Sequence, residues 1–277
     1  MVNKNNNSGV SIALNAINTS IENGLPFLVK KMPRQFTIKI ANTLVEREAV
    51  FRMGYQIYLD KGFIKPNSQN WMVQNYDFDE DTVILMVQDQ DKNLAGSLTM
   101  VFDGSSKLPA EKIYGKELKD LKNSGERMVE LSRLVVNPGY RNSKEILVLL
   151  FNYLAIYSYH IKNYTSLVVE VNPRHKDYYK ALLNFDEIGK EKACPMVQNA
   201  PAVLLHLPLK RYQSEVIRCK NQNNTDKRER SLYSFFLKPE QENLVAYYLQ
   251  KQATPISAEE KQYFGYSESN SQMAVAR

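Results

Sequence analysis

The stretch Val129-Glu-Leu-Ser-Arg-Leu-Val-Val-Asn-Pro-Gly-Tyr-Arg141 indicates the fold of this 277-residue chain more clearly than any other part of its sequence. Its apolar first half predicts a β-strand, and Asn137-Pro138-Gly139 is a strong turn signal that should lead into a helix. The strand also carries Glu130 and Arg133. Residues three apart in a regular strand point to opposite faces, so we predict a β-bulge that brings these two side chains to one site.

Predicted strands and helices alternate on both sides of this stretch, which is typical of an α/β layered fold. The alternating or continuous apolar runs that predict strands lie at residues 34–40, 81–87, 94–102, 129–136, 166–171 and 202–209. The segments that predict helices lie at residues 44–59, 109–122, 144–162, 174–183, 239–252 and 257–263.

Changes in composition divide the chain into three parts. Residues 1–33 begin with an Asn-rich tip and are expected to form a flexible arm. Residues 34–210 hold the predicted α/β domain. Residues 211–277 are first polar and then helical, so we expect a C-terminal extension that either packs over the domain as a lid or stands in solvent.

The composition excludes several classes of protein. The chain has 43% hydrophobic and 24% charged residues, which is typical of a globular protein that buries a core. No apolar run approaches the roughly 20 residues needed to span a bilayer, and the N-terminus lacks the apolar segment of a signal peptide, so we expect a cytoplasmic protein. Cys194 and Cys219 are too few for a disulfide framework, and no metal-ligand spacing is present, so no metal site is predicted. The net charge of +6 either attracts an acidic partner or aids solubility, and no motif indicates nucleic-acid binding.

Three motifs resemble those of known acyltransferases. The Glu-x-Ser-Arg core at residues 130–133 resembles the central strand of acyl-homoserine-lactone synthases and of the related N-acyl amino acid synthases, which belong to the GNAT superfamily. The run Asn172-Pro-Arg-His175, which leads to Tyr179, resembles a strand-to-helix motif of the N-acyl amino acid synthases. Asn199–Leu205 resembles the entry into their last strand, and the whole resemblance covers about residues 40–210.

The resemblance implies a GNAT-like α/β (α+β) fold, in which a mixed central sheet is flanked by helices and followed by a helical C-terminal extension. It implies an enzyme that moves a fatty acyl group from an acyl-carrier-protein or acyl-CoA thioester to the amine of an amino acid. The phosphopantetheine thioester would be a co-substrate, and no permanently bound cofactor is expected. Two other functions stay open: an acyl-homoserine-lactone-type autoinducer synthase, and a non-catalytic protein of this fold that binds an acyl carrier protein or a ligand.

The sequence departs from the family at two positions where glycine is usual. Arg141-Asn-Ser-Lys-Glu145 has no glycine in the loop that would hold a pyrophosphate, and Asn184 stands before Phe185. A helix N-terminus still attracts an anion, so Arg141, Ser143 and Lys144 are predicted to hold one phosphate, as the arm of an acyl carrier protein would present. Carrier proteins are acidic, so the basic chain agrees with such a transient partner, and a solvated positive face explains the charge equally well.

The candidate catalytic residues follow from the chemistry together with the resemblance. An amine must lose a proton to attack a thioester, and Glu130 is the predicted base, with an ion pair to Arg133 as its alternative role. Arg133 is predicted to belong to the same site. By resemblance, Tyr179 or its neighbour Tyr178 protonates the leaving thiolate. His175 is a candidate proton shuttle, or else it caps a helix or faces solvent.

Other residues are predicted to bind the two substrates. The resemblance implies that the central strand and its parallel neighbour splay apart, so that the backbone of Val135 and Val136 binds the pantetheine and a free N–H there stabilises the oxyanion. Asn172 is predicted either to contact the pantetheine or the acceptor, or only to form a turn. The candidate acceptor-binding residues are Arg47, Arg52, Trp71 and Ser132, and Tyr76 either lines an acyl pocket with Trp71 or fills the core.

Overall fold

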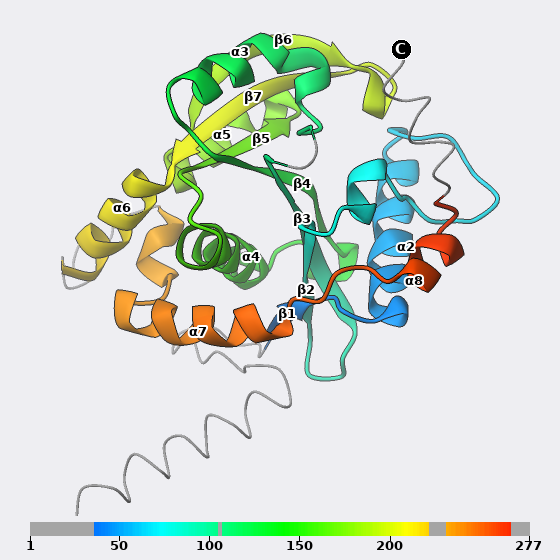
Figure 1. The fold of residues 1–277 in the computed structure, drawn as a ribbon, viewed down its shortest axis with the longest axis horizontal. Helices are drawn as coiled ribbons and strands as arrows, with labels where there is room; N and C mark the ends of the chain where they lie inside the picture. Colours follow the sequence, from blue (N-terminus) through cyan, green and yellow to red (C-terminus); the bar gives the residue numbers. More distant parts are fainter. Residues whose placement is uncertain (1–35, 105–106, 222–230, 267–277) are drawn as a thin grey trace, which may run out of the picture.

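The computed structural model describes residues 36–104, 107–221 and 231–266, and within these ranges seven strands form one mixed sheet (Figure 1). The strands lie in the order β1-β2-β3-β4-β5-β7-β6. Their bounds are β1 (Thr37–Ile40), β2 (Val83–Gln88), β3 (Leu94–Phe102), β4 (Met128–Val136), β5 (Ser166–Val171), β6 (Asp186–Cys194) and β7 (Ala200–Pro208). The predicted mixed central sheet is confirmed, and the predicted N-terminal arm, residues 1–33, lies outside the described residues.

The helices agree closely with the predicted ones up to residue 183 and again from residue 239. They are α2 (Leu44–Asp60), α3 (Glu111–Asn123), α4 (Lys144–Ile156), α5 (Pro173–Leu183), α6 (Leu209–Asn221), α7 (Pro239–Gln252) and α8 (Ala258–Tyr263). A short π-helix, η3 (Tyr157–Ile161), continues α4, and 3-10 turns lie at η1 (Asn75–Phe78), η2 (Pro138–Tyr140), η4 (Pro195–Val197) and η5 (Leu232–Phe235). In the part of the chain that the structure describes, we find no helix with the length and apolar character to cross a membrane.

β4 and β5 are parallel neighbours in the middle of the sheet, whereas the other neighbouring strands pair antiparallel. The parallel ladder joins Met128–Leu131 to Ser166–Val169. Both strands continue beyond this ladder, β4 to Val136 and β5 to Val171. The carboxyl ends of the two strands therefore separate, as the resemblance implied.

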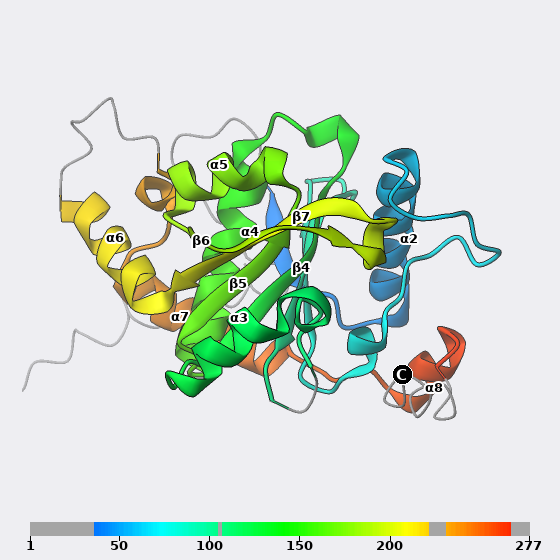
Figure 2. The same ribbon diagram turned by 90° about the horizontal axis from the view of Figure 1, so that it is seen from above.

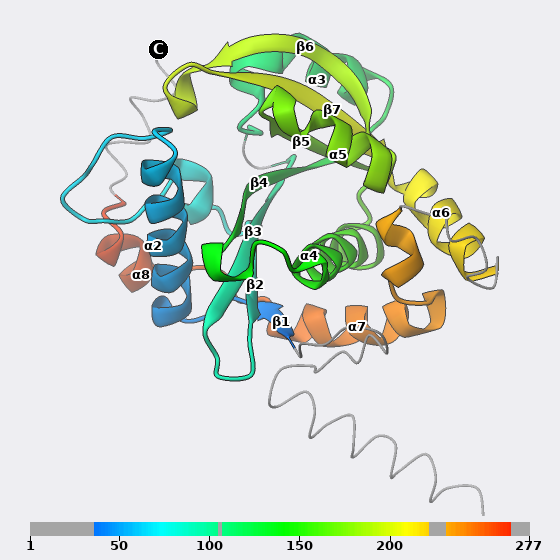
Figure 3. The same cartoon turned by 180° about the vertical axis from the view of Figure 1, so that it is seen from behind.

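Helices cover both faces of the sheet (Figures 2 and 3). On one face, α4 packs against β2 and β3, and α5 packs against β6 and β7. On the other face, α2 contacts β3 and β4, and α3 contacts β6. α4 can be apolar on nearly all sides because the sheet covers one side of it, and α7 and the buried residues Leu232, Tyr233, Phe236 and Leu237 cover the other.

The segment after residue 210 is part of the same core. Tyr212, Tyr233, Val245 and Leu249 are buried in one cluster with α4. The polar Asn152 of α4 connects them, because its amide donates to the Tyr212 hydroxyl at 2.9 Å and accepts from the Leu237 N–H at 3.0 Å. Of the two predicted arrangements, a covering segment and a solvated one, the structure has the covering one for its described residues.

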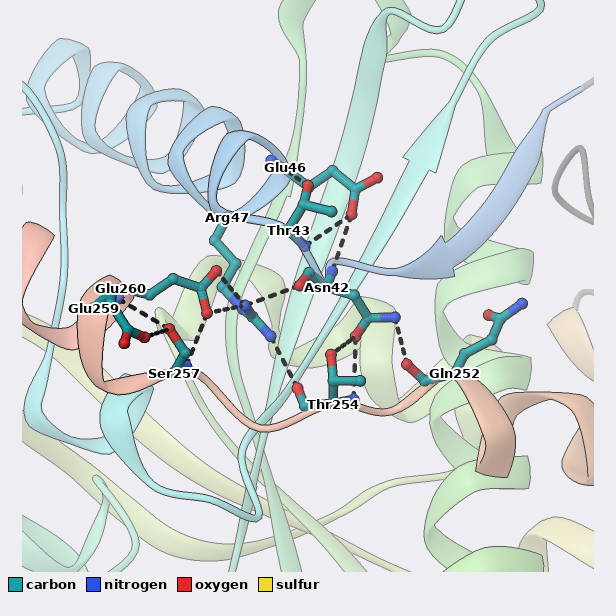
Figure 4. A network of polar contacts seen from close by, with 9 residues as sticks. All are labelled: Asn42, Thr43, Glu46, Arg47, Gln252, Thr254, Ser257, Glu259 and Glu260. Carbon is teal, nitrogen blue, oxygen red and sulfur yellow. Dashed lines mark hydrogen bonds and ion pairs between the residues drawn. The ribbon is translucent and has the colours of Figure 1, made fainter.

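A network of polar contacts attaches the last part of this segment to the start of α2 (Figure 4). The buried Arg47 guanidinium donates to the Glu260 carboxylate at 2.5 and 2.7 Å and to the Thr254 carbonyl at 2.9 Å. The side-chain oxygen of Asn42, just before α2, also accepts hydrogen bonds from the N–H and the hydroxyl of Thr254. This network holds α8 beside α2, as Figure 1 shows.

Two elements have no counterpart among the predicted ones. β6 is rich in charged residues and largely exposed, and two register irregularities against β7 interrupt its alternation, so its period-two signal is weak. α6 buries Leu209, Tyr212, Val216 and Cys219 at helical spacing, a stripe that its many charged residues obscure. β6 matters for function because it ends at Cys194, next to the site described below.

Candidate active site

A cavity of about 160 Å³ lies at the point where β4 and β5 separate. Its polar lining residues are Glu130, Ser132 and Arg133 from β4, Glu170 and Asn172 from β5 and the residue after it, and Cys194 from the end of β6. Its other lining residues include Tyr58, Phe63, Met72, Tyr76, Met196 and Val197. Four of the predicted site residues, Glu130, Ser132, Arg133 and Asn172, therefore meet at one cavity.

Glu130 is a carboxyl group in a largely dehydrated position, with only 3% of its surface exposed. Its Oε2 accepts a hydrogen bond of 2.9 Å from the backbone N–H of Ala110, at the start of α3. Burial raises the pKa of Glu130 to about 8, and the negative charge of Glu170 acts in the same direction. A carboxyl with this pKa gains and loses a proton near neutral pH, which is the property a general base requires.

The predicted β-bulge is present in β4. Thr99 pairs with Ser132 and Ser97 with Val135, so two residues of β4, Arg133 and Leu134, lie opposite one residue of β3. Arg133 has φ +46°, in the left-handed region that a non-glycine residue seldom adopts. The bulge turns the Arg133 side chain to the face that carries Glu130 and Ser132, and all three line the cavity.

Arg133 does not pair with Glu130, so that alternative role of Glu130 is wrong. The guanidinium of Arg133 makes a two-pronged ion pair with the buried Asp77 of η1, in which Nη1 lies 2.7 Å from Oδ2. The same guanidinium also donates to the Met72 carbonyl and the Thr99 hydroxyl, both at 3.0 Å. These partners neutralise and orient Arg133, which therefore supports one wall of the cavity rather than presenting a free cation to it.

Ser132 and Tyr76 form the contact between β4 and the segment before β2. Their hydroxyl oxygens are 2.9 Å apart, and the Tyr76 ring lies against the Arg133 guanidinium at 5.3 Å. Burial raises the pKa of Tyr76 far above its ordinary value, so its hydroxyl stays protonated. Tyr76 and Ser132 both line the cavity, and Tyr76 also packs against the core, so its role in an acyl pocket stays a prediction.

Three residues predicted to bind the acceptor lie away from the cavity. Arg47 is committed to the C-terminal segment through Glu260. Arg52 is exposed, where it pairs with Glu48 at 2.6 Å and lies over the Trp71 ring. Trp71 packs against Phe264 and Tyr263 of the C-terminal segment. We therefore assign Arg47, Arg52 and Trp71 to the packing of that segment.

The predicted residues of α5 are distributed between the core and the surface. Tyr179 is buried among the rings of Phe151, Tyr178 and Phe185, and burial raises its pKa well above the ordinary value. His175 is exposed and accepts from Arg174 at 3.1 Å; burial of part of its ring and the charge of Arg174 lower its pKa, so it is neutral at pH 7. Neither residue lines the cavity, and their catalytic roles stay predictions.

The position of Asn172 is compatible with both of its predicted roles, which are turn formation and contact with a ligand. Its side chain caps α5 by accepting from the Arg174 N–H at 3.3 Å, and its amide donates to the Pro201 carbonyl at 3.2 Å. It nevertheless lines the cavity beside Glu170. Its geometry is thus set by the turn before Pro173, a position from which it can contact a ligand.

Basic residues gather at the surface where α4 and α5 begin. Burial, and after it the positive charges of Arg174 and Arg141, lower the pKa of Lys61, the residue that follows α2. Lys144 instead places its ammonium 4.2 Å from the Phe235 ring, and Ser143 stands at the N-cap of α4. Of the predicted donor-binding residues, Arg141 thus belongs to a basic cluster with Lys61 and Arg174, two residues that sequence reasoning missed.

Sequence reasoning also missed Glu170 and Cys194 as members of the site. A carboxylate near the end of the apolar strand Ser166–Val171 was the available signal, because a buried strand seldom carries one without a reason. No such signal existed for Cys194, which reaches the cavity only because β6 pairs with β7.

A larger hollow of about 400 Å³ lies between β2, η3 and residues 250–256. Of its charged lining residues, Arg47 pairs with Glu260, Asp77 with Arg133 and Asp81 with Lys162, and Glu80 is exposed. It contains neither Glu130 nor any other residue of the strand motif. We therefore take the smaller cavity as the candidate active site. Among the residues that the structure describes, no three His, Cys, Asp or Glu side chains are grouped so that they could hold a metal ion.

Comparisons with known proteins relate this fold and site to one family. The profile of the N-acyl amino acid synthase FeeM matches residues 49–208. The structure of FeeM, an N-acyl amino acid synthase from uncultured soil microbes, is similar with a TM-score of 0.57 and 23% sequence identity, over 65% of this chain and 94% of FeeM. The AHL synthase LasI gives a TM-score of 0.49 and 16% identity, over 64% of this chain and 91% of LasI. No curated protein sequence matches significantly.

The matched region contains the whole cavity, including Glu130, the bulge at Arg133, and the Asn172 turn. It spans more than half of the 277 residues, and the family that the three motifs predicted is thereby confirmed. The chain belongs to the N-acyl amino acid synthase FeeM family and is an N-acyltransferase with a GNAT-like fold.

Proposed function

We propose that this N-acyltransferase moves a fatty acyl group from the phosphopantetheine thioester of an acyl carrier protein to the amine of an amino acid, giving an N-acyl amino acid. The observation that carries the proposal is the position of Glu130. Its buried carboxyl, with a pKa of about 8, lines a cavity at the separation of β4 and β5. An extended pantetheine arm entering between these strands would bring its thioester to that carboxyl.

The reaction follows from the residues around this point. Glu130 accepts a proton from the acceptor amine, whose nitrogen then attacks the thioester carbonyl. The backbone of Val135 and Val136 lies on the part of β4 beyond its ladder with β5 and pairs on its other edge with β3. Successive N–H groups of a strand point to opposite edges, so one of the two faces the gap beside β5, where it is suited to bind the pantetheine or the oxyanion. Tyr179 keeps its proton because its pKa is raised, so it can supply a proton to the leaving thiolate if the donor reaches it.

Two features favour a carrier protein over coenzyme A as the donor. The loop from Arg141 to Glu145 has no glycine to admit a diphosphate closely, whereas one phosphate needs only a charged cluster. Lys61, Arg141 and Arg174 form such a cluster, and their positive charge complements the acidic surface of a carrier protein.

An assay with two donors and several acceptors tests the proposal. The same acyl chain is presented on an acyl carrier protein and on coenzyme A, with a panel of amino acids and with S-adenosylmethionine. We expect thiol release and an N-acyl amino acid by mass spectrometry, faster with the carrier protein. Release only with S-adenosylmethionine would contradict the amino-acid acceptor, and a faster reaction with coenzyme A would contradict the carrier donor.

Two variants test whether Glu130 is the catalytic base. Glu130→Gln should lose at least about a hundredfold in turnover, the usual contribution of a general base, while donor binding is retained. The matched variant Glu191→Gln, at an exposed position of β6, should keep the wild-type rate. Full activity of Glu130→Gln would eliminate Glu130 as the base.

A further inference from the structure

Glu170 is the second carboxyl group of the cavity. The parallel ladder pairs Glu130 with Val168 and Leu131 with Val169, so Glu170 lies one position beyond the last residue that β5 pairs with β4. Residues two apart in a strand share a face, so Glu170 follows Val168 on the face that carries Glu130. Both carboxyl groups line the cavity at the place where the two strands separate.

Cys194 holds Glu170 from the other side. The thiol of Cys194, at the end of β6, hydrogen-bonds to the Glu170 carboxyl. Burial and the neighbouring carboxylate raise the pKa of Cys194 to about 12, so the sulfur keeps its proton and serves as a hydrogen-bond donor rather than as a nucleophile. Cys194 is itself buried and lines the cavity beside Glu170.

The charges that face the cavity are unbalanced. Arg133 is the cation among the lining residues, and Asp77 neutralises it through the two-pronged ion pair. Among the lining residues that the structure describes, no further cation is left to pair with Glu130 and Glu170. A pair of carboxyl groups in such a position favours a positively charged ligand, and an amino acid or other amine arrives at neutral pH as an ammonium ion.

We propose that Glu170 binds the ammonium group of the acceptor amine and holds it next to Glu130, which takes up the proton. This inference rests on the proposed function and names the residue that positions the acceptor in that same cavity. Glu170 is only partly buried, whereas Glu130 is almost fully buried. An incoming ammonium therefore meets Glu170 on the more accessible side and Glu130 on the enclosed side.

The protons and bonds balance along this route. One N–H bond of the ammonium breaks, its electron pair stays on nitrogen, and the proton passes to the ionised carboxylate of Glu130. The nitrogen then forms a bond to the thioester carbon, and the carbon–sulfur bond breaks with its electron pair going to sulfur. The second proton leaves nitrogen and ends on that sulfur as the free thiol. Glu130 finally releases its proton to solvent.

Among the described titratable groups around Glu170, we expect Glu130 and Glu170 itself to change charge over the pH range of an activity assay, whereas the others keep their protons. Tyr58 of α2 and Tyr114 of α3 both have raised pKa values, because they are buried and because the Glu170 charge opposes their ionisation. Cys194 also stays protonated. Glu170 itself has a raised pKa owing to burial, which the hydrogen bond from Cys194 partly offsets. The acid side of an activity profile against pH should therefore report on the two carboxyl groups.

The test compares Glu170→Gln with the wild type and with the exposed control Glu191→Gln, using the carrier-bound donor. The KM for the acceptor should rise about tenfold or more, the factor that corresponds to one lost hydrogen bond to a charged group. The acid side of the profile should move to lower pH, because Glu130 ionises more easily without a neighbouring negative charge. Donor binding should not change. The profile shift needs only the charge of Glu170 and not its contact with the acceptor, so the acceptor KM is the readout that tests binding.

Two outcomes overturn this inference while the proposed function stands. One is an unchanged acceptor KM in Glu170→Gln, whatever its pH profile, when Glu130→Gln is inactive. The other uses Glu170→Asp, which keeps the charge but shortens the side chain by one methylene group. This variant also serves as the test if Glu170→Gln does not fold. Glu170→Asp should raise the KM and leave the profile in place, and an unchanged KM contradicts the inference. Failure of the proposed function is different, because the wild type itself then forms no N-acyl product.

Discussion

At the scale of single residues, Glu130 has opposing effects on activity and stability. Its carboxyl group is almost wholly removed from water. One of its two oxygens, Oε2, accepts a 2.9 Å hydrogen bond from the backbone N–H of Ala110, which offsets part of the lost hydration. Such a position shifts the pKa upward, which suits a base near neutral pH, and it also penalises the ionised form in the folded protein. The same burial that supports catalysis should therefore lower stability at alkaline pH.

This opposition predicts how stability depends on pH. The pKa of Glu130 is about 8 in the folded chain and near its ordinary value of 4.5 when unfolded. The folded state therefore binds the proton more tightly, and the contribution of Glu130 to stability is lost as pH rises from about 4.5 through about 8. Glu130→Gln should then be more stable than the wild type above pH 8, by up to about 4 kcal/mol, and equal to it at pH 4 and below.

Urea unfolding at a series of pH values measures this difference. Gln at position 130 can still accept from Ala110, so the hydrogen bond is a matched feature of the two proteins. The exposed variant Glu191→Gln should follow the wild-type curve throughout. Parallel curves for Glu130→Gln and the wild type would mean that Glu130 has an ordinary pKa.

At the scale of elements, the packing of α3 onto β6 and β7 keeps Cys194 beside the cavity. The Tyr114 hydroxyl donates to the Ala202 carbonyl at 2.6 Å and also lies 3.0 Å from the Lys190 carbonyl, so it joins both strands. The Tyr114 ring lies directly over Gly189 of β6. A Cβ at position 189 would meet ring atoms of Tyr114 at 2.6 Å and the Leu204 Cβ at 2.8 Å.

Gly189→Ala should therefore destabilise the protein. The hydrogen bonds to both strands hold the tyrosine in place, so the added methyl forces a backbone shift, which we expect to cost about 1–3 kcal/mol. Gly115→Ala is the matched control on α3, because a Cβ there has no heavy atom within 4 Å. That control should stabilise the helix by about 0.5–1 kcal/mol. Thermal unfolding measures the stability of both variants. Equal melting temperatures would show that Tyr114 moves aside without a measurable loss of stability.

At the scale of the whole molecule, the C-terminal segment joins parts of the chain that are far apart in sequence. The core around α4 includes residues from β1 to α7, and α8 lies beside α2 (Figure 1). The ion pair between Arg47 and Glu260 joins residues 213 positions apart (Figure 4). Phe264 completes this contact by packing against Phe51 and Trp71.

Glu260→Gln should weaken this attachment strongly. It removes the carboxylate from Arg47, a residue that is only 5% exposed, and because the pair is mostly buried the loss should cost up to about 3 kcal/mol. Glu259→Gln is the adjacent control, since its carboxylate contacts only the nearby Ser257 at the surface and should change stability by no more than about 0.5 kcal/mol. Urea unfolding compares the two, and equal losses would show that the Arg47 contact contributes nothing particular.

The sequence by itself determined the order of most strands and helices, the family, and the central acidic residue. These properties rest on local periodicity and on short motifs, which are present before the chain folds. The bulge at Arg133 was predictable for a related reason, because strand geometry requires it if residues 130 and 133 are to share a face. The weakest elements to predict were β6 and α6, whose charged residues mask their periodic pattern.

Only the tertiary structure decided which side chains are partners. Arg133 pairs with Asp77, which is 56 residues away, and Arg47 pairs with Glu260 rather than with a substrate. Glu170 and Cys194 meet beside Glu130 because β5, β7 and β6 are neighbours in the sheet. The physical reason is that a charge removed from water must find its partner among the groups that the fold brings near it, and sequence spacing does not specify those groups.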